Sequence, residues 1–227
     1  MSRVLIACER FGVIRDAFIK AGHDAMSCDL VETSAPGPHY AGDVRDILDD
    51  GWDLMIAHPD CTYLCSSGLH WNHRTPGRAE KTEQALNFVR LLMAAPITRI
   101  AIENPMGRIG TAIRKADQII QPYEFGDDAS KRTGLWLKNL PLLKPTGYVE
   151  PRLVCQDCKA VFTYGQHKCP HCSSQRYLPR WANQPDSGQN KLGPSEDRAM
   201  LRAKTYQGWA DAMADQWGNI LKGDDEL

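Results

Sequence analysis

Short strand-like segments separated by helical patterns constrain the fold of this chain more than any other sequence feature. Residues 3–8, 54–59 and 99–105 are apolar runs that stop at a polar turn or a proline, which predicts buried strands. Residues 24–30 predict a further strand, and residues 12–21 and 79–95 carry apolar side chains at helical spacing. Strands that alternate with helices predict an α/β fold with a mostly parallel sheet and helices on both faces.

Polar residues follow these strands where each of them ends. In an open α/β sheet, ligands bind at the carboxyl ends of the strands, so these residues are the first candidates for a functional site. The candidates are Glu9, Asp29, residues 58–61, Glu103 and Asn104. The sequence therefore predicts one site that gathers side chains from several strands.

The composition limits the class of protein. The chain has 227 residues, a formal net charge of -1, 42% hydrophobic and 24% charged residues. These values are ordinary for one globular core with a small appendage and exclude disordered, collagen-like and coiled-coil classes. They also argue against binding nucleic acid through overall positive charge, although a local basic patch remains compatible with them.

The organisation changes after about residue 144. We predict an α/β core over residues 1–150, a small insert over residues 151–180, and a loop and helix over residues 181–222 that return to the core. The returning helix is expected from Ser195, a candidate N-cap, through Trp217.

The chain has eight cysteines, but its beginning does not resemble a secretory signal, and no apolar stretch is long enough to span a membrane. We therefore expect a cytoplasmic location without a membrane partner, where cysteines serve as metal ligands, catalytic groups or core residues.

Two Cys-x-x-Cys knuckles, ten residues apart, are the most specific local signal. Their cysteines are Cys155, Cys158, Cys169 and Cys172. This spacing suits one tetrahedral zinc ion with four thiolate ligands, in a closed structural site. Free cysteine pairs or a redox pair would not explain two knuckles in a segment too poor in apolar residues to fold alone. His167 and His171 are less favoured ligands.

Six segments carry a resemblance to a known family. They are Val4–Phe18, Cys28-Asp29-Leu30, Gly42-Asp43-Val44, Pro59-Asp60-Cys61, Glu103-Asn104-Pro105 and Ser195–Gly218. In this order they resemble the motifs of the DNA cytosine (carbon-5) methyltransferases, and more closely those of short bacteriophage-type relatives. The resemblance covers roughly residues 3–144 and 194–218. It implies a Rossmann-like, S-adenosylmethionine-dependent methyltransferase fold with a small zinc-binding insert.

The resemblance also implies roles. Cys61 corresponds to the nucleophile that adds to carbon-6 of cytosine, with Cys65 as a competitor. Glu103 is expected to give a proton or a strong hydrogen bond to the ring nitrogen, if burial raises its pKa. Arg132 is expected to contact the base or the intermediate. The residues expected to bind S-adenosylmethionine are Glu9, Phe11, Gly12, Asp29, Asp43, His58 and Pro59.

The implied partner is DNA, from which the target cytosine must be flipped out. Residues 150–204 contain nine Lys or Arg and five Asp or Glu, interleaved with Tyr164, Tyr177 and Trp181, a pattern that suits phosphates and stacked bases. We interpret the zinc insert as a small replacement for the family's target-recognition region, and residues 69–81 as a flap over the flipped base.

The chain departs from the family pattern in two places. The glycine-rich first motif is reduced to residues 9–12, and Asp60 replaces a second proline. Two alternatives therefore stay open: a zinc-containing nucleic-acid-binding protein with a degenerate core, or a cytosine-modifying enzyme that acts on nucleotides or RNA. Methylation of an exocyclic amino group is disfavoured, because residues 104–106 lack the second proline and the aromatic residue of those enzymes.

Overall fold

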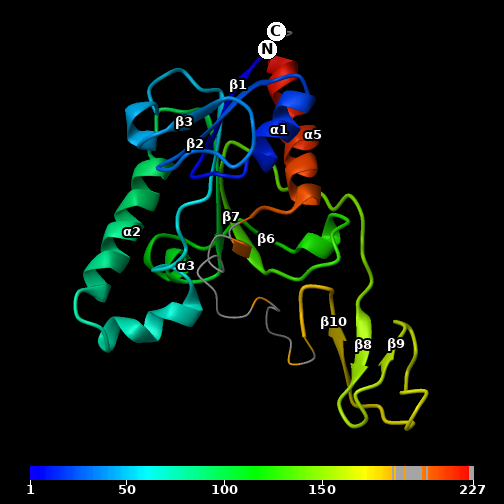
Figure 1. The fold of residues 1–227 in the computed structure, drawn as a ribbon. Coiled ribbons are helices and arrows are strands. Elements are labelled where there is room, and N and C mark those ends of the chain that lie inside the picture. Colours follow the sequence, from blue (N-terminus) through cyan, green and yellow to red (C-terminus); the bar gives the residue numbers. More distant parts are fainter. Residues whose placement is uncertain (186, 188–191, 193–200, 203, 225–227) are drawn as a thin grey trace.

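A seven-stranded sheet forms the centre of the computed structural model, which describes residues 1–185, 187, 192, 201–202 and 204–224 (Figure 1). Its strands are β1 (Arg3–Ala7), β2 (Asp24–Asp29), β3 (His39–Ala41), β4 (Leu54–Ala57), β5 (Arg99–Pro105), β6 (Gln118–Ile120) and β7 (Thr133–Lys138). The helices around it are α1 (Val13–Lys20), α2 (Arg78–Met93), α3 (Arg108–Ala112) and α5 (Gln207–Asp224). Short 3-10 helices cover Val44–Asp46, Ser66–His73 and Pro122–Glu124.

The strand order is β3-β2-β1-β4-β5-β7-β6. Strands β1 to β5 run parallel, whereas β7 pairs antiparallel with both β5 and β6. The predicted mostly parallel α/β sheet is thus present. The sequence did not predict β3, β6 or β7. Strands β3 and β6 have only three residues each, too few to show a period.

The parallel strands bury both faces because helices cover each side of the sheet. Val4 and Ile6 of β1 point into a core that includes residues of α1 and α5, and Leu5 and Ala7 point into a second core that includes residues of α2. Strand β4 repeats this alternation. A near-continuous apolar run is therefore the pattern that such a strand requires.

Helix α5 returns to the core from a distant part of the sequence. It lies beside α1 in Figure 1 and packs against it. Trp209, Met213 and Trp217 are fully buried in the core that this pair shares with the sheet. The expected helix start at Ser195 lies outside the described residues.

The zinc insert projects away from the main sheet, at the lower right of Figure 1. It contains β8 (Arg152–Cys155), β9 (Val161–Phe162) and β10 (Tyr177–Arg180), in the order β10-β8-β9. Its buried apolar residues are few: Leu153 and Phe162 pack around Cys155 and Cys169, and Val154 is also buried. The insert therefore has no core of a size that would fold alone.

Aromatic stacking joins the insert to the main domain. Trp181 stacks on Tyr123 with ring centroids 4.3 Å apart, and its indole Nε1 donates to the Val149 carbonyl. Asn183 exchanges hydrogen bonds with the backbone of Ser130. None of the described helices has both the length and the apolar character to cross a membrane.

Candidate active site and metal centre

The carboxyl ends of β1, β2, β4 and β5 meet at one edge of the sheet, as the sequence predicts. A cavity of about 550 Å³ lies at this edge. Of the residues expected to bind a cofactor, Asp29, Asp43 and Pro59 line it, together with Tyr63 and Phe88. The hydrogen bond and ion pair with Arg45 hold the pKa of Asp43 at about 2. The cavity therefore has a permanently ionised carboxylate in its wall.

A second, smaller cavity of about 160 Å³ adjoins the first, since Cys8 and Asp29 line both. Glu9, Phe11 and His58 complete most of its wall. Cys8 has a left-handed φ of 59°, which turns the chain directly after β1. The predicted cofactor residues thus divide between two neighbouring cavities.

Glu9 has a structural role at the start of α1 that the sequence did not predict. Its carboxylate accepts hydrogen bonds from the backbone N–H groups of Ile14 and Arg15, and so caps the first turn of α1. Burial raises its pKa. Gly12 is the N-cap of α1 with a φ of 68°, and a Cβ there would meet the Arg15 guanidinium. The structure therefore gives both residues a role in starting α1.

His58 and Glu103 form a buried pair at the ends of β4 and β5. His58 Nδ1 lies 2.7 Å from Glu103 Oε2. Burial, the largest influence, raises the pKa of Glu103, but the charge of Lys131 and the hydrogen bond from His58 outweigh it and lower the pKa to about 2. The expectation that burial leaves Glu103 with a raised pKa is wrong, because the charge of Lys131, His58 and the Thr133 hydroxyl all lower it.

The loop that carries Cys61 is fastened to the segment after β5. Asn104 Nδ2 donates to the Pro59 carbonyl at 2.6 Å. The N–H of Ser66 donates to the Met106 carbonyl, and that of Arg108 donates to the Leu64 carbonyl at 2.7 Å. The Glu103-Asn104-Pro105 segment therefore positions the Cys61 loop, in addition to supplying a carboxylate.

Cys61 and Cys65 face each other across one turn, because the N–H of Cys65 donates to the Cys61 carbonyl. The hydrogen bond between their thiols is the largest influence on both: it raises the pKa of Cys61 and lowers that of Cys65 to about 5. Ser67 and the Gly68 N–H also stabilise the Cys65 thiolate. In the free protein, Cys65 therefore ionises before Cys61.

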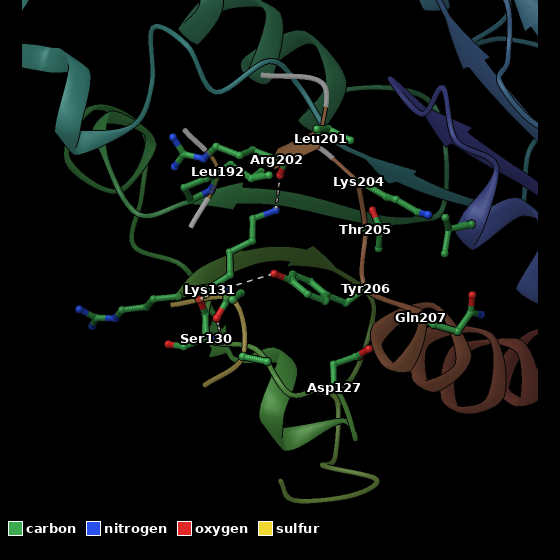
Figure 2. A pocket seen from close by; sticks show the side chains of 15 residues that line it. Asp127, Ser130, Lys131, Leu192, Leu201, Arg202, Lys204, Thr205, Tyr206 and Gln207 are labelled. Atoms are coloured by element: carbon green, nitrogen blue, oxygen red, sulfur yellow. Dashed lines mark hydrogen bonds between the residues drawn. The ribbon is translucent and has the colours of Figure 1, made fainter. Parts of the chain in front are cut away.

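A basic cavity of about 790 Å³ opens on the α1 and α5 side of the sheet (Figure 2). Its charged lining residues are Lys131, Arg132, Arg202, Lys204 and Asp127. Figure 2 shows Lys131 reaching toward Arg202, whose carbonyl accepts from Lys131 Nζ at 3.4 Å. Thr205 lines both this cavity and the small one beside His58. The three cavities thus follow one another along the edge of the sheet.

The structure places Arg132, the predicted base-contacting residue, at the exposed rim of this cavity. Its neighbour Lys131 is the residue whose charge acts on both Glu103 and Cys61. Lys131 was not among the residues predicted from the sequence, although the alternation of side chains along β7 indicates on which face of the sheet it lies. Thr133 and Leu135 share a face of the sheet with Lys131, and Leu135 pairs with Glu103.

The predicted flap is partly ordered. Residues 66–73 form a 3-10 helix and α2 already begins at Arg78, so the expectation of one continuous loop over residues 69–81 is wrong. Arg78 donates to the Thr62 carbonyl and lies over the Tyr63 ring, which ties this segment to the Cys61 loop.

Comparison with solved structures gives distant similarities only. No protein-family model matches the chain, and no curated protein does. The chain is similar to the crystal structure of the S. pombe Dnmt2 methyltransferase, with 18% identity and a TM-score of 0.36. The match covers 63% of this chain and 50% of that one, so the chain spans about half the length of that protein. A similarity of this size does not assign an activity, and the chemistry must be argued from the residues of the site.

The four insert cysteines come together as predicted. Their sulfur atoms all lie within 4.8 Å of one another. Cys155 Sγ is 3.6 Å from Cys172 Sγ, and Cys158 Sγ is 3.5 Å from Cys169 Sγ. Four thiolates about 2.3 Å from a tetrahedral zinc ion have this order of separation. The cluster is thus compatible with zinc. His167 and His171 do not belong to it.

Proposed function

We propose that the chain is an S-adenosylmethionine-dependent methyltransferase that methylates carbon-5 of cytosine in DNA through a covalent cysteine adduct. The observation that carries this proposal is the attachment of the Cys61 loop to the strand end that bears Glu103. One set of hydrogen bonds holds the nucleophile Cys61 and the carboxylate of Glu103 in place. This arrangement suits addition of a thiolate to cytosine, because a charge that develops on the ring nitrogen must be stabilised at the same time.

The first and second cavities are the proposed cofactor site. A volume of about 550 Å³ is in the range of small-molecule sites. Asp29, at the end of β2, suits ribose hydroxyls, and Phe11 suits an aromatic ring. The free acceptors in this edge also fit a cationic, hydrogen-bonding ligand. When bound, S-adenosylmethionine supplies a methyl group on a sulfonium.

The proposed chemistry starts at Cys61. Its thiolate adds to carbon-6 of the flipped cytosine, which makes carbon-5 nucleophilic. Glu103, with a pKa of about 2, stays ionised at neutral pH, so it accepts a hydrogen bond from the ring nitrogen after that nitrogen has taken a proton from water. The charge of Lys131 opposes the rise in the pKa of Cys61 and helps to hold Glu103 in its charged form. Loss of the carbon-5 proton and of the cysteine then releases the product.

The basic cavity is the proposed entrance for the nucleic acid. Four cationic side chains line it beside the amide of Asn183 and the phenol of Tyr206, a set that suits phosphates and a base. We further propose that the four-cysteine insert contributes to target recognition, since Ala182 and Asn183, which follow the insert in the chain, line this cavity. Such an enzyme would have short-site or weak sequence specificity.

Cys65 is a second candidate nucleophile because its pKa is the lower of the pair. Cys61 is preferred because Asn104 positions the segment immediately before it. In this scheme Cys65 accepts the hydrogen bond of the Cys61 thiol in the free protein.

The test is a transfer assay with a labelled methyl donor and DNA, RNA or dCMP, followed by nucleoside analysis. We expect 5-methylcytosine in DNA. Cys61→Ser should abolish transfer and Cys65→Ser should retain it; the reverse result would assign the nucleophile to Cys65. Methylation of RNA alone, or of dCMP alone, would assign that molecule as the substrate in place of DNA. No methyl transfer to any of the three, with binding of DNA retained, would support a degenerate methyltransferase core.

A further inference from the structure

His58 has contacts that its expected role in cofactor binding does not explain. Its side chain is 10% exposed and that of Glu103 is 7% exposed, so their 2.7 Å contact is shielded from water. His58 follows Leu54 and Ile56 on the face of β4 that packs toward α1 and α5. Glu103 follows Ala101 on the same face of β5. The pairing is therefore set by the registry of two neighbouring strands.

The hydrogen bond from His58 gives the two oxygens of the Glu103 carboxylate different surroundings. Oε2 accepts from His58, whereas Oε1 is buried and no hydrogen bond of normal geometry reaches it within the described part of the chain; the Thr133 hydroxyl is close enough to the carboxylate to lower its pKa. A buried carboxylate oxygen without a partner costs free energy unless a ligand satisfies it. Oε1 of Glu103 can therefore accept a hydrogen bond from a donor on a ligand that enters the site.

His58 is itself surrounded by acidic groups from several strands. Glu9, after β1, acts on it electrostatically, and Asp29, after β2, lines the same small cavity. Its Nε2 is buried without a partner among the described residues. Glu103 receives the Nδ1 contact, and the charge of Lys131 also acts on Glu103. The imidazole therefore bridges the cofactor side and the base side of the site.

We propose that His58 is a positioning residue that occupies Oε2 of Glu103 and thereby leaves Oε1 as the oxygen that meets the target pyrimidine. This inference rests on the proposed function. With Oε2 fixed, the carboxylate cannot rotate to offer both oxygens, and the protonated ring nitrogen or the exocyclic amino group meets Oε1. Orienting a charged partner through a buried hydrogen bond is an established way to fix a catalytic group.

The role predicts different behaviour for two substitutions. His58→Asn places an amide nitrogen near the position of Nδ1, so it can still donate to Oε2. His58→Leu fills a similar space without a donor. Loss of the His58 donor should raise the pKa of Glu103 above about 2, while the charge of Lys131 continues to lower it. A purely space-filling role would make the leucine variant the better of the two.

The activity readout needs no methyl donor. When the Cys61 thiolate adds to carbon-6, the electrons of the 5,6 double bond move to carbon-5, which takes a proton from water. Reversal removes the original hydrogen from carbon-5 and expels the thiolate. Tritium release from DNA that carries 5-tritiated cytosine therefore measures addition alone. We expect His58→Leu to slow release by about 100-fold, with the KM for DNA nearly unchanged, and His58→Asn to recover at least about tenfold.

The second readout is independent of activity. Carbon-13 NMR of proteins labelled at the glutamate carboxyl carbons gives the pKa of Glu103, whose signal is identified by its loss in Glu103→Gln. We expect a low pKa in the natural protein and in His58→Asn, and a raised one in His58→Leu. Circular dichroism checks folding. If the leucine variant is unfolded, His58→Gln, whose longer chain displaces the donor from Oε2, takes its place.

The outcomes separate the two proposals. Release in His58→Leu that matches the natural protein, or an unchanged Glu103 pKa in that variant, overturns the positioning role. If the natural protein releases no tritium from DNA, RNA or dCMP, the proposed function is wrong, while the NMR titration still decides whether His58 sets the state of Glu103.

Discussion

The backbone of Gly107 lies directly against the carbonyl oxygen of Leu64, so that no side chain fits between them. A Cβ on Gly107 would collide with that oxygen and would approach Cys65 Cα and Ser66 N at 2.9 Å. These are backbone atoms of the loop that carries Cys61 and Cys65, and they cannot move aside as a flexible side chain can. The close approach permits the hydrogen bonds that fasten this loop to the end of β5.

Gly107→Ala should therefore displace the loop. We expect a loss of about 1–3 kcal/mol in the free energy of unfolding, measured with urea, and a strong reduction of tritium release from 5-tritiated DNA. Gly110→Ala is the matched control, because nothing lies within 4 Å of a Cβ at that position of α3. The control should be neutral or slightly stabilising. Equal effects of the two substitutions would contradict the steric argument.

The thiols of the site should differ in their reaction with iodoacetamide. Cys65 has a pKa of about 5, so its thiolate is present above that pH and is lost as the pH falls through 5. Burial raises the pKa of Cys8 and Cys28 to about 12, so these two stay protonated at neutral pH. At pH 6, mass spectrometry should find Cys65 alkylated first.

The bond between the two thiols is tested by Cys61→Ala in the same assay, because alanine has no donor, whereas a serine hydroxyl could replace the thiol as donor. Loss of the thiol that donates to Cys65 should raise the pKa of Cys65 and slow its alkylation at pH 6. Alkylation of Cys61 ahead of Cys65 in the natural protein would show that the proton sits on the other sulfur.

The four-cysteine cluster should hold one zinc ion per chain. Cys158→Ser removes one of four ligands and should abolish stoichiometric zinc, measured by atomic emission after dialysis. The insert has too small an apolar core to compensate, so its amide protection should also be lost. His171→Ala, outside the cluster, should keep the metal. Retention of zinc in Cys158→Ser would refute the four-thiolate site.

The basic cavity should bind nucleic acid in a salt-dependent way. Arg132→Gln and Lys204→Gln each remove one cationic side chain from its lining. If both contact phosphates, each should weaken binding of a DNA duplex and reduce the slope of log K against log salt by about 1. Fluorescence anisotropy at several salt concentrations measures this slope. Lys20→Gln, at the far end of α1, should leave it unchanged.

The apolar runs of residues 3–8, 54–59 and 99–105 determined the parallel part of the sheet, because a strand buried on both faces must be apolar along its length. Helices α1 and α2 followed from their spacing of apolar residues. The ligand spacing of the four cysteines likewise predicted their cluster, since a tetrahedral site restricts which cysteine spacings can supply it. These features depend on local patterns, which a sequence carries explicitly.

Only the tertiary structure decided what each site residue contacts. His58 and Glu103 are 45 positions apart, and the pairing of β4 with β5 brings them to 2.7 Å. The sequence places Glu103 at the end of a buried strand, where burial would raise its pKa, but it does not show that Lys131 and His58 act on the carboxylate and reverse the shift. Electrostatic interactions depend on distance in space and on exclusion of water, and neither is encoded in the spacing of residues along the chain.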